Sequence, residues 1–355
     1  MSRLFTPLAL RSVTLPNRVW VSPMCQYSAT DGLPNDWHLV HLGQFAAGGA
    51  GLILTEASAV TPEGRISPQD TGIWNDDQAT AWRRVTDFAH ERGAVIGMQL
   101  AHAGRKASTF RPWEGAGSVP VEQGGWASVG ADDQPFGNYA PARGLSTDEV
   151  ARIPAAFAAG ARRALDAGFD LVELHFAHGY LAHEFLSPLS NSRTDRYGGD
   201  FDGRMRLALE ITDAVRGEIG PDVPLLARIS ASDWADGGWS IDDSVHLVKL
   251  LADRGTDLVD VSSGGNVAHP KIPIGPGYQV PFAERIRRET AVPTGAVGMI
   301  TEPEQAEQIV ATGAADAVFL ARALLRDPHW PQRAAHVLGG EVAWPDQYLR
   351  AKPRR

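Results

Sequence analysis

Eight short apolar segments, separated by polar or helix-like stretches, are the feature of this 355-residue chain that most restricts its fold. The segments are RVWVSPM, AGLILTEA, AVIGMQLAHAG, FDLVELHFAH, VPLLARIS, TDLVDVSSGG, VPTGAVGMI and ADAVFLARAL. Helical periodicity between them predicts helices over residues 79–92, 146–167, 201–217, 241–254 and 302–312. Strands that alternate with helices form parallel sheets. Eight such units predict an α/β protein with a single (β/α)8 TIM barrel.

Local signals refine the boundaries of this barrel. STDE at residues 146–149 and TEPE at residues 301–304 each place a hydroxyl three residues before a glutamate, which is the pattern of a helix-capping box. Residues 103–145, approximately, are rich in Gly, Pro and Trp and are too many for an ordinary connection. We expect them to form a lid or subdomain inserted after the third strand. We expect the barrel to span residues 1–340 and a C-terminal tail to span residues 341–355.

Charge and composition exclude several classes of function. The formal net charge is −9 and no basic block precedes the extreme C-terminus, which argues against a nucleic-acid partner. No apolar run approaches the roughly 20 residues that span a bilayer, and the N-terminus lacks a signal-peptide core, so we expect a cytoplasmic protein without a membrane partner. Cys25 is the single cysteine, so neither an intrachain disulfide nor a cluster held by several thiolates is possible.

Reactive or polar residues stand where the predicted strands end, which is where TIM barrels carry their chemistry. They are Cys25 and Tyr27 after the first strand, Gln99 in the third, His175, His178 and Tyr180 after the fourth, and Arg228 in the fifth. Gln99 can donate and accept hydrogen bonds, whereas Arg228 only donates. Together they match the edge of a flat heterocycle with alternating donors and acceptors, such as the pyrimidine ring of a flavin.

The last two predicted strands end in a pattern suited to phosphate. The seventh runs into GAVGMI and the eighth into Ala321 and Arg322. Free backbone N–H groups at helix starts and a guanidinium both favour a dianion, and the loops after strands seven and eight are its usual place in these barrels.

Five longer motifs identify the chain as similar to a known family. They are NRVWVSPMCQYSATDG, LILTEASAVTPEGRISPQDTGIW, QLAHAGRKA, ELHFAHGYLAHEFLSPLSNSRTDRYGG and LLRDPHWP. With them, nearly the whole chain resembles the Old Yellow Enzyme family of FMN-dependent ene-reductases, in its thermophilic-like branch. The resemblance implies a barrel that binds FMN noncovalently, takes hydride from NADPH or NADH, and delivers it to an activated alkene by ping-pong kinetics.

The resemblance also implies roles for individual residues. For the cofactor these are Pro23, Met24 and Cys25 beside the flavin, Ala57 and Gln99 at its ring edge, Arg228 facing the region that becomes anionic on reduction, and Gly298 and Arg322 at the phosphate. For the substrate they are His175 and His178 at the carbonyl oxygen, Tyr180 as proton donor and Tyr27 in the pocket wall. Ala321 departs from the family, which usually has glycine there, and its methyl group affects the fit around the phosphate while its N–H remains available.

The spacing of His175 and His178 suits this role. Alternation along a strand points Glu173 and His175 into the barrel, and the chain then curls over the rim, so that His178 can lie beside His175. Two fixed N–H donors at one carbonyl oxygen stabilise the charge that develops during hydride attack, and Tyr180 then protonates the α-carbon from the opposite face. Inward-pointing Glu173 is also a possible partner of Arg228, and His38 and His41 are expected to be structural.

Other functions remain as alternatives. A related flavoprotein with an Fe–S cluster needs four thiolates and is excluded by the single cysteine. A metal-dependent barrel hydrolase would use His175 and His178 as ligands but needs further ligands at other strand ends, so we predict no metal site. A Schiff-base aldolase needs a lysine on a strand, and Lys106 lies past one. A noncatalytic flavin-binding protein is the nonenzymatic alternative.

The tail carries one more prediction. Composition alone suggests a frayed basic end. The family resemblance instead implies that Arg350, with Tyr348 as a packing anchor, reaches the active site of a neighbouring subunit in a homodimer or a homotetramer built from dimers.

Overall fold

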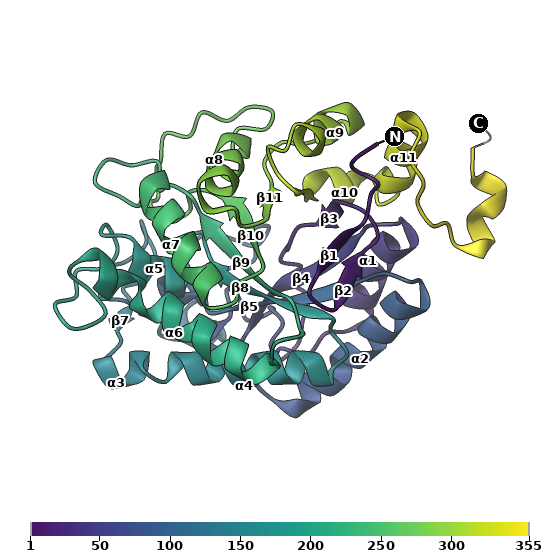
Figure 1. Cartoon of the computed structure of the whole chain (residues 1–355). Helices are drawn as coiled ribbons and strands as arrows, with labels where there is room; N and C mark the ends of the chain where they lie inside the picture. Colours follow the sequence, from purple (N-terminus) through teal and green to yellow (C-terminus); the bar gives the residue numbers. More distant parts are fainter. Residues whose placement is uncertain (1, 354–355) are drawn as a thin grey trace.

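The eight apolar segments form one closed parallel barrel in the computed structural model, which describes residues 2–353 (Figure 1). In barrel order the strands are β3 (Val19–Val21), β4 (Leu52–Ala59), β5 (Ile96–Ala101), β8 (Leu171–Phe176), β9 (Leu225–Ser230), β10 (Leu258–Ser262), β11 (Thr294–Ala296) and β12 (Ala317–Leu320). β12 pairs with β3 and closes the barrel. The predicted TIM barrel is confirmed.

Helices surround this barrel. They are α1 (Asp36–Ala47), α2 (Asp76–Glu91), α3 (Thr147–Val150), α4 (Ile153–Asp166), α5 (Leu181–Leu186), α6 (Phe201–Ile219), α7 (Ile241–Asp253), α8 (Val280–Thr290), α9 (Pro303–Ala311), α10 (Arg322–Arg326) and α11 (Trp330–Leu338). The helix expected over residues 146–167 is two helices, and Pro154 stands in the first turn of the second, where its missing N–H is tolerated.

One of the two predicted capping boxes is present. The Ser146 hydroxyl accepts the N–H of Glu149, and the Glu149 carboxylate accepts the N–H of Ser146. The second prediction was wrong, because α9 has Glu302 rather than Thr301 as its cap residue. Pro303 occupies the first helical position and shifts the start of the helix by one residue.

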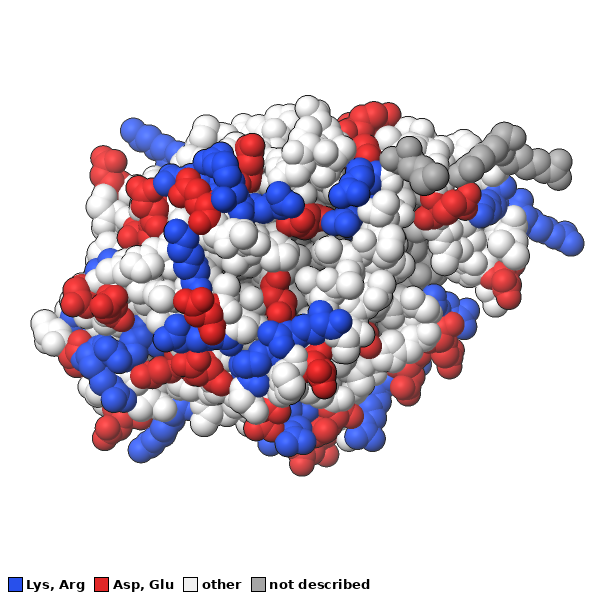
Figure 2. All heavy atoms as spheres, in the orientation of Figure 1, with Lys and Arg blue, Asp and Glu red and all other residues white. Residues whose placement is uncertain are grey.

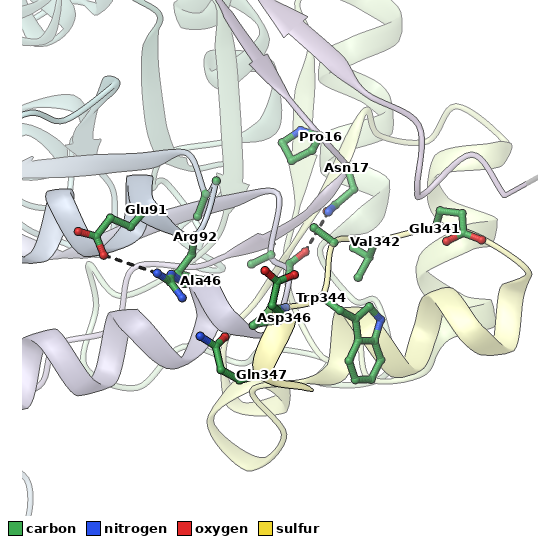
Figure 3. A pocket seen from close by; sticks show the side chains of 16 residues that line it. Pro16, Asn17, Ala46, Glu91, Arg92, Glu341, Val342, Trp344, Asp346 and Gln347 are labelled. Carbon is green, nitrogen blue, oxygen red and sulfur yellow. Dashed lines mark hydrogen bonds and ion pairs between the residues drawn. The ribbon is translucent and has the colours of Figure 1, made fainter. Parts of the chain in front are cut away.

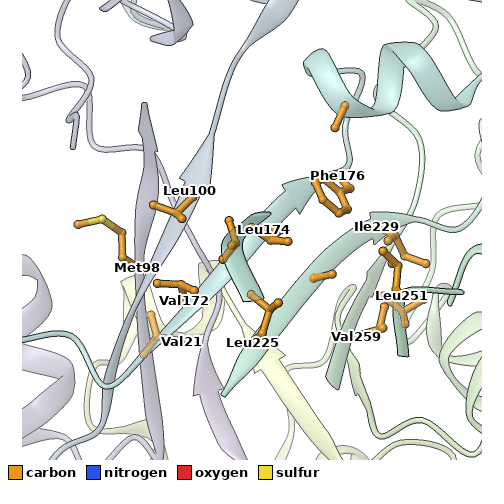
Figure 4. Packing of buried hydrophobic residues seen from close by; sticks show 14 of the residues in the cluster. Val21, Met98, Leu100, Val172, Leu174, Phe176, Leu225, Ile229, Leu251 and Val259 are labelled. Carbon is orange, nitrogen blue, oxygen red and sulfur yellow. The ribbon is translucent and has the colours of Figure 1, made fainter. Parts of the chain in front are cut away.

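Two apolar layers follow from the alternation of side chains along the strands. Residues facing outward, including Met98, Leu174 and Ile229, pack against the helices in the large cluster shown in Figure 4. Residues facing inward at the amino-terminal half of the barrel form a second cluster with the hairpin of β1 (Leu8–Leu10) and β2 (Val13–Leu15). The hairpin therefore covers the amino-terminal end of the barrel interior.

The predicted insertion follows β5 and contains the 3-10 turns η2 (Gly104–Lys106) and η3 (Val121–Gln123), and the short strands β6 (Val129–Gly130) and β7 (Arg143–Gly144). Glu184 of α5 anchors it at two places, since its carboxylate accepts the N–H of Arg105 at 2.7 Å and that of Ala131 at 3.0 Å. The insertion is therefore attached to the barrel at its carboxyl-terminal end.

The C-terminal tail leaves the barrel after α11 and ends in the 3-10 segment η4 (Asp346–Ala351), drawn in yellow in Figure 1. A cavity of about 510 Å³ lies between the start of the tail and the amino-terminal ends of the strands, with Asn17, Arg92 and Trp344 among its lining residues (Figure 3). Barrel enzymes place their chemistry at the opposite end, so we attribute this cavity to the packing of the tail.

The surface carries charged side chains of both signs (Figure 2). On the face shown in Figure 2, acidic and basic side chains are interspersed. Within residues 2–353, every helix is too short or too polar to cross a bilayer.

Candidate active site

Four polar side chains form a layer inside the barrel, directly above the apolar inward-facing cluster. Gln99 Nε2 donates to Glu173 Oε1 at 2.8 Å, and Arg228 Nε lies 3.0 Å from Asp260 Oδ2. Strand pairing produces this layer, because Gln99 stands opposite Glu173 and Arg228 opposite Asp260. All four are buried.

Burial changes the protonation of the acids in this layer. Burial, followed by the charge of Asp260, raises the pKa of Glu173 to about 8. Burial also raises the pKa of Asp260 to about 6, although Arg228 acts in the opposite direction. The expectation that Glu173 pairs with Arg228 was wrong, because Asp260 stands in register with Arg228 on the next strand and forms the ion pair.

His175, His178 and Tyr180 come together above this layer. The ring centroids of the two histidines are 5.2 Å apart, and those of His175 and Tyr180 are 5.0 Å apart. Burial, followed by the charge of Arg228, lowers the pKa of both histidines well below the usual value. Both imidazoles are therefore neutral, and a neutral imidazole carries one N–H that it can donate.

The hydrogen bonds of the histidines show which nitrogens are free. His175 Nδ1 accepts the N–H of Ala177 at 3.4 Å, which leaves Nε2 as the donor. His178 Nε2 lies 2.8 Å from the Ser262 hydroxyl, so Nδ1 is the nitrogen left for a ligand. Burial raises the pKa of Tyr180 well above its usual value, so its phenol keeps its proton.

The loop after β3 forms another wall of the candidate active site. Pro23, Met24, Cys25 and Tyr27 are half-buried there, and Cys25, Tyr27 and Tyr180 pack against a small cluster that includes Ala57. Glu56 holds the loop by accepting the N–H of Gln26 at 2.8 Å, and its other carboxylate oxygen lies 2.9 Å from His38 Nε2 on α1. Burial raises the pKa of the Cys25 thiol well above its usual value, so the thiol is neutral.

The insertion reaches this wall as well. The Trp113 ring lies edge-on to that of Tyr27 with 5.7 Å between centroids, and Trp126 packs against the cluster that includes Ala57. His38 and His41 are both buried on α1, in agreement with the structural role expected for them.

The predicted phosphate site is a cavity of about 320 Å³ at the ends of β11 and β12. Gly298, Ala321 and Arg322 line it, as expected. Gly298 has a φ of 118°, and a Cβ there would lie 2.8 Å from Gln279 Nε2, so the cavity requires glycine at this position. Ala321 has a φ of −113°, so it lies outside the left-handed region that favours glycine.

Sequence reasoning missed several residues that line this cavity, among them Tyr278, Gln279 and Arg326. Arg326 follows Arg322 by four positions, a spacing that brings side chains together on a helix and could have revealed it. Tyr278 and Gln279 lie in a loop whose path the sequence pattern does not indicate. Among residues 2–353, neither Arg322 nor Arg326 has an acidic partner, so two cations face the cavity uncompensated.

These features fit FMN. The uncompensated arginines suit a phosphate, and Ser262 connects the phosphate cavity with His178. Gln99 Oε1 accepts no hydrogen bond within the described chain, and Asp260 is the one partner of Arg228 there. An acceptor and a donor therefore remain for the edge of a flavin ring beside the half-buried loop of Pro23, Met24 and Cys25.

The residues predicted for the tail are not part of this assembly. Arg350 is exposed on η4 and has no hydrogen-bond or ion-pair partner among residues 2–353. Tyr348 packs edge-on against His329 at 5.7 Å between ring centroids. Arg350 is thus available to a second molecule.

The fold and the site define a class of barrel oxidoreductases, and comparison with known proteins agrees. Residues 3–341 match the NADH:flavin oxidoreductase / NADH oxidase family. The NADPH dehydrogenase of Geobacillus thermodenitrificans is 47% identical over 350 residues, and that of Bacillus subtilis is 45% identical over 350 residues, with 98% of both chains covered in each case. The solved structure of morphinone reductase is 28% identical, with a TM-score of 0.79 over 97% of this chain and 92% of that one.

The chain belongs to the NADH:flavin oxidoreductase / NADH oxidase family. The predicted membership of the Old Yellow Enzyme family, in its thermophilic-like branch, is confirmed, and so is the prediction of an NAD(P)H-dependent flavin oxidoreductase.

Proposed function

We propose that the protein is an ene-reductase that binds FMN noncovalently, is reduced by NADPH or NADH, and reduces the C=C bond of α,β-unsaturated carbonyl compounds. The observation that carries this proposal is the meeting of His175, His178 and Tyr180 above the layer that contains Arg228. Two neutral donors and a protonated phenol in one place are what the reduction of an enone requires.

The cofactor would be held by this chain's own groups. Arg322, Arg326 and the backbone at Gly298 would bind its phosphate, while Gln99 and Arg228 would bind the ring edge. When bound, FMN would accept hydride from a nicotinamide and supply hydride to the β-carbon of the substrate. The positive charge of Arg228 near the ring would favour the reduced, anionic form.

His175 and His178 would orient the substrate by donating hydrogen bonds to its carbonyl oxygen. Negative charge develops on that oxygen as hydride adds to the β-carbon, and donors fixed in advance stabilise this charge more than they stabilise the ground state. Tyr180 would then donate its phenolic proton to the α-carbon. Tyr27 and the insertion would exclude water from the pocket, the insertion acting as a lid.

The contacts in the site do not favour the hydrolase or aldolase alternatives, although burial lowers the pKa of Lys106 to about 8. Within residues 2–353, no group of three His, Cys, Asp or Glu side chains is placed to hold a metal ion. Lys106 donates hydrogen bonds to two backbone carbonyls, those of His178 at 2.8 Å and Gly265 at 2.9 Å, and so has a structural role. Small activated alkenes remain the proposed substrates, and a cytoplasmic location stays a prediction.

Cofactor release and steady-state kinetics test the proposal. The purified protein should be yellow and should release FMN rather than FAD on denaturation. A nicotinamide should bleach the flavin band and an enone should restore it, with parallel double-reciprocal lines. A protein that refuses FMN would contradict the proposal, and a flavin that bleaches without recovery would favour a noncatalytic flavoprotein.

We also propose that Arg350 completes the pocket of a neighbouring subunit in a homodimer or homotetramer. Its support is a guanidinium that is exposed and has no partner among residues 2–353, on a segment that projects from the barrel (Figure 1). Arginine suits this role because its planar fork forms several hydrogen bonds and its charge persists at any working pH.

Deleting the residues after Gly340 should raise the KM for the enone by about tenfold, the effect of one lost charge-assisted hydrogen bond, while FMN stays bound. Mixing this truncated chain with a full-length chain that carries His175→Ala and His178→Ala should restore a low KM, since the intact pocket then receives Arg350 from its partner. A full-length chain with Arg350→Ala and the same histidine changes is the matched control. Confirmed mixed dimers without restored affinity would show that the tail does not act in trans.

A further inference from the structure

The turn between His178 and Tyr180 has an unusual backbone. His178 has a φ of 63° and Gly179 a φ of 71°, so two successive residues are left-handed. This conformation is unfavourable for histidine, which has a Cβ. A Cβ at position 179 would lie 2.4 Å from the carbonyl oxygen of Gly265, so the neighbouring loop also restricts the turn. Such a turn persists only where its surroundings hold it.

His183 holds this turn directly. It lies in α5 with its side chain fully buried, and its Nδ1 accepts the N–H of Gly179 at 2.9 Å. Its other nitrogen, Nε2, lies 3.0 Å from Asp233 Oδ1, which is also fully buried. Because Nδ1 accepts, a ring proton is on Nε2 and is donated to Asp233.

Asp233 is itself fixed. Its other oxygen, Oδ2, accepts from the Ser187 hydroxyl, from the N–H of Trp239 at 2.9 Å and from Asn266 Nδ2 at 3.3 Å. Asp233 follows β9, the strand that carries Arg228, whereas His183 belongs to the segment after β8. The pair therefore ties the turn of one strand end to the loop of the next.

We propose that His183, oriented by Asp233, is a positioning residue that sets the placement of His178 and Tyr180. This inference rests on the proposed ene-reductase function for its catalytic consequence. His183 is shielded from the pocket, so it acts through the turn and not on the substrate.

Two variants separate the two hydrogen bonds of His183. The amide oxygen of Asn in His183→Asn can replace Nδ1 and accept from Gly179, whereas the longer side chain of His183→Gln can reach Asp233 but loses the bond to Gly179. We expect His183→Gln to slow enone reduction of the flavin-loaded enzyme by about tenfold to a hundredfold, as expected for a small misplacement of reacting groups. His183→Asn should retain most of that rate.

Reduction of the flavin by the nicotinamide should change less than enone reduction in His183→Gln. The fold loss in enone reduction caused by His183→Gln should also be smaller when Tyr180→Phe is already present, because both changes act on the same proton transfer. The matched control is His90→Gln, which alters a second His–Asp pair whose side chains are partly exposed, with 3.1 Å between His90 Nε2 and Asp170 Oδ2.

Amide hydrogen exchange provides a readout that does not depend on the reaction. Exchange at Gly179 should accelerate by about tenfold or more in His183→Gln and little in His183→Asn, since only the former opens this hydrogen bond. Unchanged exchange at Gly179 in His183→Gln, or equal slowing of both half-reactions, would overturn the proposal. If the wild-type enzyme reduced no enone, the proposed function would fail, and the exchange measurement would still decide whether His183 holds the turn.

Discussion

The barrel interior has a lower half, toward the amino-terminal ends of the strands, and an upper half, toward their carboxyl-terminal ends. The same strands supply apolar residues to the lower half and polar residues to the upper half. On three adjacent strands an inward-facing leucine is followed, two positions later, by an ionisable or charged residue: Leu171 and Glu173 on β8, Leu226 and Arg228 on β9, and Leu258 and Asp260 on β10. All six side chains are buried. Two residues further along each strand, the interior therefore changes from apolar core to the polar residues of the candidate active site.

The two halves contribute differently to stability. Burying one leucine stabilises the fold by about 1.5–3 kcal/mol. Burying a charge is unfavourable unless it is paired, and a buried ion pair is often no better than apolar residues of the same volume. The Arg228–Asp260 pair and the neutral histidines are therefore explained by function rather than by stability. The lower half stabilises the barrel. Burial of polar groups in the upper half has a free-energy cost that offsets part of this stabilisation.

The largest effect that tests this division is expected in the upper half. His175→Ala combined with His178→Ala should lower the rate of enone reduction by at least about a hundredfold, the usual cost of losing even one preorganised donor. The melting temperature and bound FMN should change little. Stopped-flow measurement of the two half-reactions would show the loss in the enone step.

His175→Asn, which keeps an N–H donor, should recover part of the rate lost in His175→Ala. His90→Ala, at an exposed histidine, should leave the enone step unchanged. Turnover that persists in the double variant would remove both histidines from the mechanism.

In the lower half, a substitution should lower stability but leave the rate of enone reduction nearly unchanged. Leu226→Ala creates a cavity among fully buried side chains and should lower the free energy of unfolding by about 2–5 kcal/mol. The rate per folded molecule should stay nearly unchanged, because Leu226 lies below the polar layer. Urea denaturation and active-site titration would measure the two quantities.

Ile274→Ala is the control for this prediction, since Ile274 is 69% exposed and should cost little stability. A large fall in the rate per folded molecule with Leu226→Ala would mean that the two halves are not separable.

The lower half and the positions of the site residues could be predicted from the sequence, because both depend on local order along a strand. Alternation placed Gln99, His175 and Arg228 at the mouth, and the strand-helix pattern predicted the barrel. Partners across strands were harder to predict. The expected pairing of Glu173 with Arg228 was wrong because facing inward does not indicate which neighbour is closest, and the ion pair went to Asp260 on the next strand.

Other features depend on loops whose paths periodicity does not describe. Tyr278, Gln279 and the bonds of Lys106 belong to this group. The shift at the start of α9 came from a local conflict between a cap and a proline, which the capping pattern alone does not resolve.

The last prediction concerns Glu173, whose carboxyl lies in the polar layer of the upper half. Burial, followed by Asp260, raises the pKa of Glu173 to about 8, whereas a glutamate in the unfolded chain has a pKa of about 4.3. Below pH 4 both states are protonated and no penalty exists. As the pH rises toward 8, the unfolded state loses its proton first, so the folded state becomes less stable. Glu173→Gln keeps an amide oxygen for Gln99 and has no charge to bury.

The variant should therefore gain stability over the wild type as the pH rises from 5 to 8, and the gain should level off above that. A shift of one pKa unit corresponds to about 1.4 kcal/mol, so even part of the shift is measurable as a difference in melting temperature between pH 5 and pH 8. Glu122→Gln, at an exposed position, should show no such change. An equal difference at both pH values would mean that Glu173 is ionised in the folded protein, and that the polar layer contains one more negative charge than we infer.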